Sequence, residues 1–479
     1  MNNILGQPIP PAYKHQAEAF QRSKDMDDFA LLMEAGTGKT RVILDTAAYL
    51  YSCGKIDSLI VVAPNGVHRN WLGEVEAHLP GDIPRVAAYY QSGAGKRQQA
   101  QFEEATQAQG KLRILAFNVE ALSLLPILKQ TLKYIGKRSC LTIVDESQRI
   151  KSPSSKRTRN AYKLADVSRY RRILTGTPVS QGLHDLYSQF KFLNWRIIGC
   201  KTFAEFKAMY CVMGGYEEHE IIAFRNVDHL KKRIAPYVFE ANKKDCLDLP
   251  AETWMTREVE LSTDQRRFYK DIKDKFVAEL REHRIEAPLA GVRMLRLRQL
   301  LSGFFPLEGG TWENLPCPRL ETCADIVEEA SRGKVIVWCH FQADIANVCD
   351  KLRERGIGSL PYSGAQSPSL RFEHLQRWRN DPSICALVAT PATGGVGLTL
   401  NEADTDVTYS HDYNYEEWVQ KCGRNHRAGQ TKPVTHYDLV ARGTADVRMM
   451  GVVRNKGNVA DMIKGMRYEA LIDLLQEAA

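Results

Sequence analysis

The chain has 479 residues, of which 44% are hydrophobic and 25% are charged. That composition is typical of a globular protein, and the length predicts two or three domains rather than one core. The apolar runs are far shorter than the roughly 20 residues that cross a bilayer, and the first residues do not resemble a signal peptide. We therefore expect no membrane association. The 11 cysteines form no C-x-x-C pair, so we expect neither a disulfide framework nor a zinc site, and a cytoplasmic protein.

The net charge of +8 is unevenly distributed. The segment 151–172 contains eight Lys or Arg residues and one Asp. Clustered positive charge is an electrostatic footprint for a polyanion. We therefore expect Lys156, Arg157 and Arg159 to contact a polyanion, although a solvated charged face explains the cluster equally well.

Short β-rich runs alternate with helical patterns in the first part of the chain. Strands are expected at 29–33, 58–64, 85–90, 113–117, 141–146 and 171–176, and again at 334–341, 384–390, 405–410 and 433–440. The segments 182–232 and 257–303 between these runs are mostly helical, with one expected strand at 220–224. This alternation predicts an α/β fold with two parallel sheets and helical insertions.

The predicted domain boundaries follow the same alternation. A first lobe spans 1–240 with a helical insertion at about 182–232, and a linker spans 241–256. A second lobe spans 257–460 with a helical insertion at about 257–303, and a C-terminal helix spans 461–479.

The sequence MEAGTGKT, residues 33–40, lies between an expected strand and an expected helix. Gly36 and Gly38 allow backbone N–H groups around Thr37 to surround a polyphosphate without a Cβ in the way. The helix that begins near Lys39 directs its positive end at the same anion. Lys39 is expected to reach the β- and γ-phosphates, and Thr40 to ligate Mg²⁺.

A second strand ends in two acids, Asp145 and Glu146. We expect Asp145 to hold Mg²⁺ and Glu146 to act as the general base on the attacking water. The glycine loop, this acid pair and the segment 175–178 each follow a strand directly. In parallel sheets ligands bind beyond the carboxyl ends of the strands, so three strand ends are expected to converge on one nucleotide.

The sequence VQKCGRNHRAGQ, residues 419–430, carries a third group of polar residues. Gln420, Arg424 and Arg427 are spaced four and three residues apart, which places them on one face of a helix. Arginine stabilises the charge of a phosphoryl group in transfer. The alternative is that these arginines lie on the surface and pair with Glu416 or Glu417.

Taken in order, these motifs resemble the Swi/Snf-type ATPases of helicase superfamily two. The matching segments are YKHQ (13–16), MEAGTGKT (33–40), VAPNGVHRNWLGE (62–74), VDESQRIKSPSSKRTR (144–159), LTGTPVSQGLHDLY (174–187), KVIVWCHF (334–341), TPATGGVGLTL (390–400) and QKCGRNHRAGQ (420–430). The resemblance implies two RecA-like parallel-sheet lobes and an ATPase stimulated by nucleic acid, in a compact form similar to bacterial or phage members.

The resemblance also implies a role for individual residues. Gln16 would recognise adenine, Arg424 and Arg427 would act as arginine fingers, and Gln420 and Gln430 would lie beside the same nucleotide. The residues expected to grip the DNA backbone are Pro64, Asn65, Asn118, Thr177, Gly394 and Gly395. The usual Asp-Glu-Ala-His is Asp-Glu-Ser-Gln here, which leaves the role of Gln148 open.

The function that these residues predict is an ATP-dependent DNA translocase or helicase that uses ATP and Mg²⁺. An RNA helicase is one alternative, and an ATP-binding nucleic-acid assembly protein without motor activity is another. Intact Lys39, Glu146, Arg424 and Arg427 argue against the latter. Stimulation of ATP turnover by different polymers separates these functions.

Overall fold

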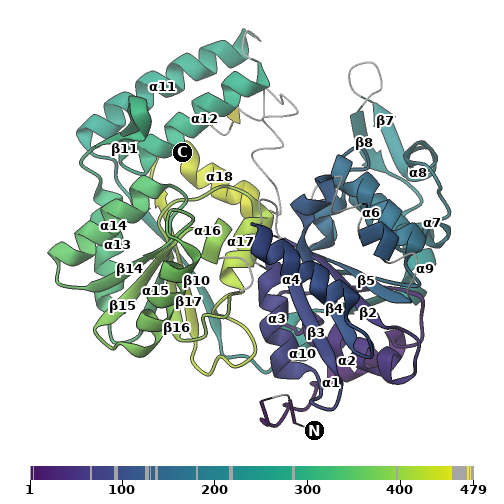
Figure 1. Cartoon of the computed structure of the whole chain (residues 1–479). Coiled ribbons are helices and arrows are strands. Elements are labelled where there is room, and N and C mark those ends of the chain that lie inside the picture. The colour runs from purple at the N-terminus through teal and green to yellow at the C-terminus, as the bar shows by residue number, and fades with distance from the viewer. Residues whose placement is uncertain are drawn as a thin grey trace. The chain divides into compact units, whose positions relative to one another are not determined.

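The computed structural model divides the chain into two compact units, Met1–Asp248 (unit 1) and Leu249–Ala479 (unit 2) (Figure 1). This division falls inside the predicted linker at 241–256. The structure describes residues 2–3, 5–64, 67–90, 95–124, 129, 131–134, 139–179, 182–214, 220–282, 286–394, 398–455, 472–473 and 475.

Unit 1 is built on a parallel sheet of seven strands in the order β3-β4-β2-β5-β6-β1-β9. The strands are β1 (Asp28–Met33), β2 (Ser58–Ala63), β3 (Arg85–Tyr90), β4 (Leu112–Asn118), β5 (Cys140–Asp145), β6 (Tyr170–Thr175) and β9 (Val238–Ala241). The six strands expected in this part of the sequence are all present.

Both faces of this sheet are buried, which is why its strands are almost continuously apolar. Along β2, Ile60 and Val62 belong to one buried cluster, whereas Leu59, Val61 and Ala63 belong to another. Helices α1 (Lys14–Ser23), α2 (Lys39–Ser52) and α3 (Val67–His78) pack in the second cluster, and α4 (Lys96–Gln107), α6 (Lys156–Val167) and α7 (Asp185–Ile198) pack in the first.

The insertion expected at 182–232 consists of helices and one hairpin. It contains α7, α8 (Phe203–Tyr210), the antiparallel strands β7 (Cys211–Gly214) and β8 (Glu220–Phe224), and the start of α9 (Val227–Ile234). Strand β8 is the one expected at 220–224. The short helices η1 (Val119–Ser123), η2 (Ser147–Ile150), η4 (Ala235–Tyr237) and α10 (Lys243–Cys246) complete the described elements of unit 1.

Unit 2 contains a second parallel sheet, in the order β10-β17-β16-β13-β15-β14. Its strands are β10 (Glu252–Val259), β13 (Lys334–Trp338), β14 (Gly358–Tyr362), β15 (Ile384–Ala389), β16 (Ala403–Thr408) and β17 (Val434–Ala441). The sequence did not indicate the two edge strands. Strand β10 is mostly solvent-exposed and so lacks an apolar run, and β14 contains Pro361, which is tolerated at a sheet edge.

Helices cover this sheet as well. The described helices are α11 (Thr263–Arg281), α12 (Ala287–Leu301), α13 (Pro318–Glu329), α14 (Gln342–Glu354), α15 (Pro368–Asn380), α16 (Pro391–Gly394), α17 (Tyr415–Cys422), α18 (Ala445–Arg454) and η5 (Glu308–Gly310), beside the hairpin β11 (Phe304–Pro306) and β12 (Trp312–Asn314). Helices α11 and α12 form most of the insertion expected at 257–303 and lie side by side (Figure 1). Residues 257–259 of that segment belong to β10 instead.

The predicted fold class, two RecA-like parallel-sheet lobes with helical insertions, is confirmed by these two sheets. The C-terminal helix expected at 461–479 falls almost entirely outside the described residues. Among the described helices, none has the length and apolar character needed to cross a bilayer.

Candidate functional site

The glycine loop, residues 34–38, connects β1 to α2 in unit 1. Gly36 and Gly38 have φ angles of 86° and 87°, a region that other residues rarely adopt. A Cβ on Gly38 would lie only 2.1 Å from Nε2 of Gln16. Both the backbone conformation and the close approach of Gln16 therefore require glycine at position 38.

Gln16 packs against this loop from α1. Its Nε2 donates to the carbonyl of Thr37 across 3.1 Å, and Nε2 of His15 lies 2.7 Å from the same oxygen. The Thr37 hydroxyl donates to the carbonyl of Glu34 across 2.7 Å. The structure thus brings Gln16 and Thr37 together, and it adds His15, which the sequence gave no reason to select.

Lys39 and Thr40 form the first turn of α2. The Lys39 ammonium donates to the carbonyls of Met33 and Glu34, at 2.8 and 3.3 Å. The ammonium is buried within the glycine loop, and its charge partly opposes the rise that burial causes in the pKa of Asp145. Lys39 and Asp145 are therefore electrostatic neighbours, as expected for groups that serve one nucleotide.

Asp145 is the last residue of β5 and Glu146 follows it, and β5 is separated from β1 only by β6. Because these three strands are parallel neighbours, their carboxyl ends meet at one edge of the sheet. Burial and the negative charge of Glu146 raise the pKa of Asp145 to about 6. Oδ1 of Asp145 accepts from the backbone N–H of Glu146 at 3.0 Å, and Oδ2 accepts from the indole of Trp71 at 3.1 Å.

Glu146 is held in a left-handed backbone conformation, with a φ of 49°. Nε2 of Gln148 donates to its carboxylate at 2.9 Å, and Oε1 of Gln148 accepts from the Thr175 hydroxyl at 2.7 Å. Oγ1 of Thr175 in turn accepts from the backbone N–H of Thr177 at 3.0 Å. A partly buried chain of hydrogen bonds therefore connects Glu146 through Gln148 and Thr175 to Thr177.

These residues fit a nucleoside triphosphate with its metal ion. The loop offers a side-chain-free cradle at Gly38, with a lysine ammonium beside it. Asp145 is a buried carboxylate next to a second carboxylate, and such a pair gains stability from a hard cation such as Mg²⁺.

The arginines of unit 2 lie beyond the end of α17, which stops at Cys422. The prediction that Gln420, Arg424 and Arg427 share one helical face is therefore wrong. The chain turns at Gly423, and the Arg424 carbonyl accepts from the backbone N–H of Leu400 at 2.9 Å. This backbone pairing replaces the helical turn that the spacing suggested.

The two arginine side chains still lie together, for a different reason. Nη1 of Arg424 and Nη1 of Arg427 both donate to the carbonyl of Leu398, at 3.4 and 3.2 Å. Nε of Arg424 also donates to the carbonyl of Gln420 at 2.9 Å. A single carbonyl therefore gathers both guanidinium groups.

Gln430 is buried and bonds to the backbone of unit 2. Its Nε2 donates to the carbonyls of Asn401, Ala403 and Asn425, and its Oε1 accepts from the N–H groups of Thr431 and Lys432. These bonds fix the loop around the arginines. They support a structural role for Gln430 more directly than the predicted contact with the nucleotide.

The expected DNA contacts of unit 1 lie near one edge of its sheet. Pro64, Asn118 and Thr177 stand at or just after the ends of β2, β4 and β6, and Asn118 is buried and donates to Oε2 of Glu120 at 3.0 Å. In unit 2, Gly394 ends α16, where a Cβ would lie 3.0 Å from the Trp338 ring. Asn65 and Gly395 lie outside the described residues.

The basic residues of segment 151–172 include exposed residues and residues that are paired within unit 1. Lys156 and Arg159 are exposed at the start of α6, and Arg157 is half-buried. Arg171 instead forms an ion pair with Asp28 at 2.6 Å, and the fully buried Arg172 donates to four backbone carbonyls. Only part of the predicted basic cluster is therefore available to a polyanion.

Two family models match the chain in the order of its two units. Residues 19–302 match the SNF2-related domain, and residues 318–429 match the Helicase conserved C-terminal domain. The first match covers more than half of the chain. The chain belongs to the SNF2-related family. This membership confirms the family resemblance that the sequence motifs predicted.

Curated relatives agree with this membership. The SNF2-related chain is 27% identical over 453 residues to an uncharacterized ATP-dependent helicase of Mycoplasma pneumoniae, covering 93% of this chain and 41% of the relative. It is 26% identical over 471 residues to the CHD3-type chromatin-remodeling factor PICKLE of Arabidopsis thaliana, covering 90% of this chain and 32% of that protein. The chain therefore spans less than half the length of these relatives.

Among solved structures, the SWI2/SNF2 ATPase core of Sulfolobus solfataricus in complex with dsDNA is similar at 20% identity and a TM-score of 0.44. The match covers 100% of this chain and 98% of that one.

Proposed function

We propose that this SNF2-related protein is an ATP-dependent translocase that moves along DNA and has the capacity to separate strands. The observation that carries the proposal is the edge of the unit 1 sheet, where the glycine loop with Lys39 follows β1 and the pair Asp145 and Glu146 stands at the end of β5, with only β6 between these strands. This set combines a phosphate cradle, a metal-binding carboxylate and a base in one place.

The residues of unit 1 have separate tasks in this proposal. The backbone of the glycine loop and Lys39 bind the phosphates, and Thr40 and Asp145 hold Mg²⁺. The metal ion, when bound, neutralises charge on the phosphate oxygens. Glu146 accepts a proton from the attacking water, and its carboxylate is oriented for this by Gln148 across 2.9 Å.

Arg424 and Arg427 stabilise the negative charge that develops during hydrolysis. Their guanidinium groups are already gathered at the carbonyl of Leu398, so little side-chain entropy is lost when they engage a phosphate. This arrangement supports a catalytic role better than the alternative of two independent surface arginines.

DNA is the polymer along which the proposed translocase moves. One relative carries the name of a chromatin-remodeling factor, and the exposed charges of Lys156 and Arg159 suit a phosphate backbone. Contacts of this kind position a protein on nucleic acid without reading its sequence. The proposed enzyme therefore has little sequence preference.

The deciding experiment measures ATP turnover without polymer and with duplex DNA, single-stranded DNA and RNA, with Glu146→Gln as the inactive control. We expect DNA to stimulate turnover and the enzyme to displace the third strand of a triplex. Stimulation by RNA alone would identify an RNA helicase. ATP turnover that neither DNA nor RNA stimulates would rule out the DNA motor. A triplex that stays intact during DNA-stimulated ATP turnover would also rule it out.

A further inference from the structure

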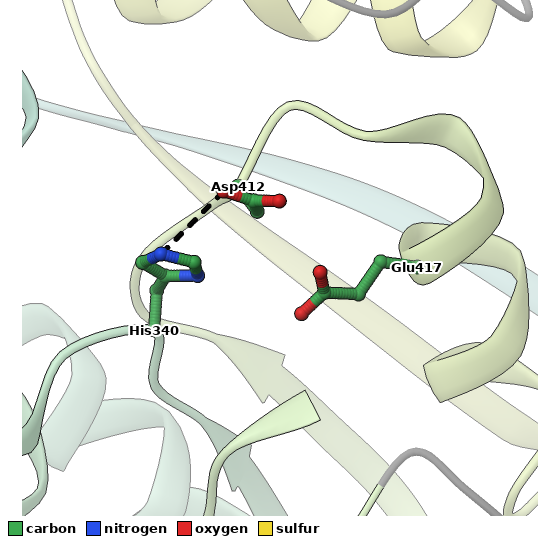
Figure 2. Close-up of side chains that lie close together, drawn as sticks. All are labelled: His340, Asp412 and Glu417. Atoms are coloured by element: carbon green, nitrogen blue, oxygen red, sulfur yellow. Dashed lines mark ion pairs between the residues drawn. The ribbon is translucent and has the colours of Figure 1, made fainter. Parts of the chain in front are cut away.

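Three side chains with metal-binding atoms converge in unit 2 (Figure 2). His340 follows β13, Asp412 follows β16, and Glu417 lies in the first turn of α17. One ligand atom from each lies within 4.8 Å of the others. Nε2 of His340 is 3.4 Å from Oδ1 of Asp412, and Figure 2 shows the Glu417 carboxylate directed at the same space.

The position of this cluster in the sheet is one where parallel sheets bind ligands. β13 and β16 are neighbours, but β13 leads to β14 on one side whereas β16 leads to β17 on the other. A crevice opens beyond the carboxyl ends of two strands whose connections diverge in this way. A cavity is present there, and Asp412, Glu417 and Lys421 are among the residues that line it.

Two cationic side chains interact with carboxylates around the cavity, which leaves the Glu417 carboxylate as a further acidic ligand beside Asp412. Nη2 of Arg298 is 2.9 Å from Oδ1 of Asp412 and forms an ion pair with it. The ammonium of Lys421 donates to the Thr408 hydroxyl and interacts with the buried Asp438. The Glu417 carboxylate therefore lies near the Asp412 carboxylate, which is paired with Arg298.

Hydrogen bonds hold the Asp412 side chain and the backbone of His340 and Glu417 in place. Arg298 donates to the His411 carbonyl through Nε and Nη2, at 3.1 and 2.7 Å, and so anchors the Asp412 carboxylate. The backbone N–H of His340 donates to the Ser410 hydroxyl at 2.7 Å. The side chain of Asn414 caps α17 by accepting from the N–H of Glu417 at 3.2 Å.

We propose that His340, Asp412 and Glu417 bind a divalent first-row cation, Mn²⁺ or Zn²⁺, at a site independent of the ATP-bound Mg²⁺. One imidazole with two carboxylates suits these ions, whereas Mg²⁺ and Ca²⁺ prefer oxygen ligands alone. Bonds of about 2.1 Å separate ligand atoms by roughly 3 to 4 Å, so small side-chain rotations complete the site. The three ligands leave coordination positions open to water or a phosphate oxygen.

The site contains no cysteine, so it differs from the zinc motifs that the cysteine spacing argued against. The chain's 11 cysteines nevertheless make Zn²⁺ a poor first probe, because thiolates bind it well. Mn²⁺ binds thiols weakly and its free form is quantified by its paramagnetic resonance signal. It is therefore the probe of choice, and Zn²⁺ is tested by its ability to displace bound Mn²⁺.

The experiment titrates the nucleotide-free, full-length protein with Mn²⁺. We expect His340→Asn and Glu417→Gln each to weaken binding by about tenfold or more, since each removes one of three ligands. Asp145→Asn removes a carboxylate of similar size from unit 1 and is the matched control. It should leave the Mn²⁺ site of unit 2 intact, which separates this proposal from the proposed ATP site.

The temperature midpoint of unfolding is a second measurement, and it compares the wild-type protein with both variants. Mn²⁺ should raise the unfolding midpoint of the wild-type protein and of Asp145→Asn, but not that of Glu417→Gln. The proposal is overturned if the wild-type protein binds no more Mn²⁺ than the Asp412→Asn variant does. It is also overturned if His340→Asn and Glu417→Gln bind the ion as tightly as the wild-type protein does.

Discussion

The indole N–H of Trp71 donates a hydrogen bond to Oδ2 of Asp145 across 3.1 Å inside unit 1. Trp71 is 1% exposed, and the other carboxylate oxygen accepts from the backbone N–H of Glu146. Both oxygens of Asp145 are therefore oriented by the protein itself. Trp71 lies in the segment 62–74 that carries the family resemblance, but nothing in its spacing indicates which atom it contacts.

Replacing Trp71 with Phe should weaken the metal site. The ring volume is largely kept, but Oδ2 of Asp145 loses a donor, and a hydrogen bond to a charged group contributes about 1.5 to 3 kcal/mol. We expect the Mg²⁺ concentration at half-maximal ATP turnover to rise about tenfold or more. Maximal turnover at saturating Mg²⁺ should fall far less.

Trp378→Phe is the matched control for this measurement. Trp378 is equally buried, in unit 2, and its indole donates to the carbonyl of Cys385 at 3.0 Å. The free energy of unfolding of Trp378→Phe should fall to a similar degree, but the Mg²⁺ concentration at half-maximal ATP turnover should not change. An equal shift in both variants would mean that Trp71 acts only through the stability of the fold.

Thr175→Val should uncouple DNA binding from ATP turnover. The Thr175 hydroxyl connects Gln148, at 2.7 Å, to the backbone of Thr177, at 3.0 Å. Valine keeps the shape but breaks both bonds, and this leaves Glu146 connected to Gln148 alone. We expect stimulation by DNA to fall about tenfold, the effect of roughly 1.4 kcal/mol, while turnover without DNA changes little.

Thr142→Val provides a buried threonine on the neighbouring strand β5 for comparison. Its hydroxyl accepts from Ser168 at 2.7 Å and is not part of the chain from Glu146 to Thr177. If Thr142→Val and Thr175→Val lower DNA stimulation equally, this hydrogen-bond chain does not carry the coupling.

Arg424→Ala and Arg427→Ala should each lower ATP turnover by about 10³-fold, the low end for arginine fingers. The affinity for ATP should fall far less, because such residues act on the transition state. Turnover and nucleotide binding are measured separately, the latter with a fluorescent analogue. Equal losses in both would identify the arginines as ground-state contacts.

The sequence predicted those parts of the fold that periodicity and strand ends determine. Buried strands such as β2 and β5 are mostly apolar runs. Asp145 ends β5, and the glycine loop that leads to Lys39 directly follows β1. The edge strands β10 and β14 were not predicted, because partial exposure removes the apolar run that identifies a strand.

The side-chain contacts of the site were less predictable. A spacing of four and three residues suggested a helix through Arg427, but α17 ends at Cys422 because the chain pairs with Leu400 instead. Such pairing joins segments far apart in the sequence. The same is true of Trp71 with Asp145 and of His340 with Asp412, so local pattern alone does not reveal these pairs.

Replacing Lys156, Arg157 and Arg159 together with Ala tests the basic surface at the start of α6. DNA affinity should weaken, and the slope of log affinity against log salt should become shallower by about 2 to 3, one unit for each lost phosphate contact. The replacement of Arg266, Lys270 and Lys275 on α11 makes the same change in charge in unit 2 and is the control. Equal DNA affinity in both triple variants would show that the cluster on α6 is a solvated charged surface that does not contact DNA.

His436 makes the stability of the protein dependent on pH. It is buried between Asp406 and Glu252, with Nε2 3.0 Å from Oε1 of Glu252 and the ring stacked 4.2 Å from Trp254. Burial disfavours the charged ring, but the two carboxylates outweigh it and raise the pKa of His436 to about 9. Because the unfolded value is near 6.5, the folded protein holds this proton more tightly than the unfolded chain.

The sign of the effect follows from this difference in pKa. The stabilisation is fully present below about pH 6.5 and is lost as the pH rises through about 9. We expect His436→Asn to be less stable than the wild-type protein at pH 6.5 by at least about 2 kcal/mol, because Asp406 also loses one of its buried partners. The measurement is the free energy of unfolding in urea for both proteins between pH 6 and pH 10. The gap between them should narrow at high pH, whereas a constant gap would show that folded His436 does not carry a proton at neutral pH.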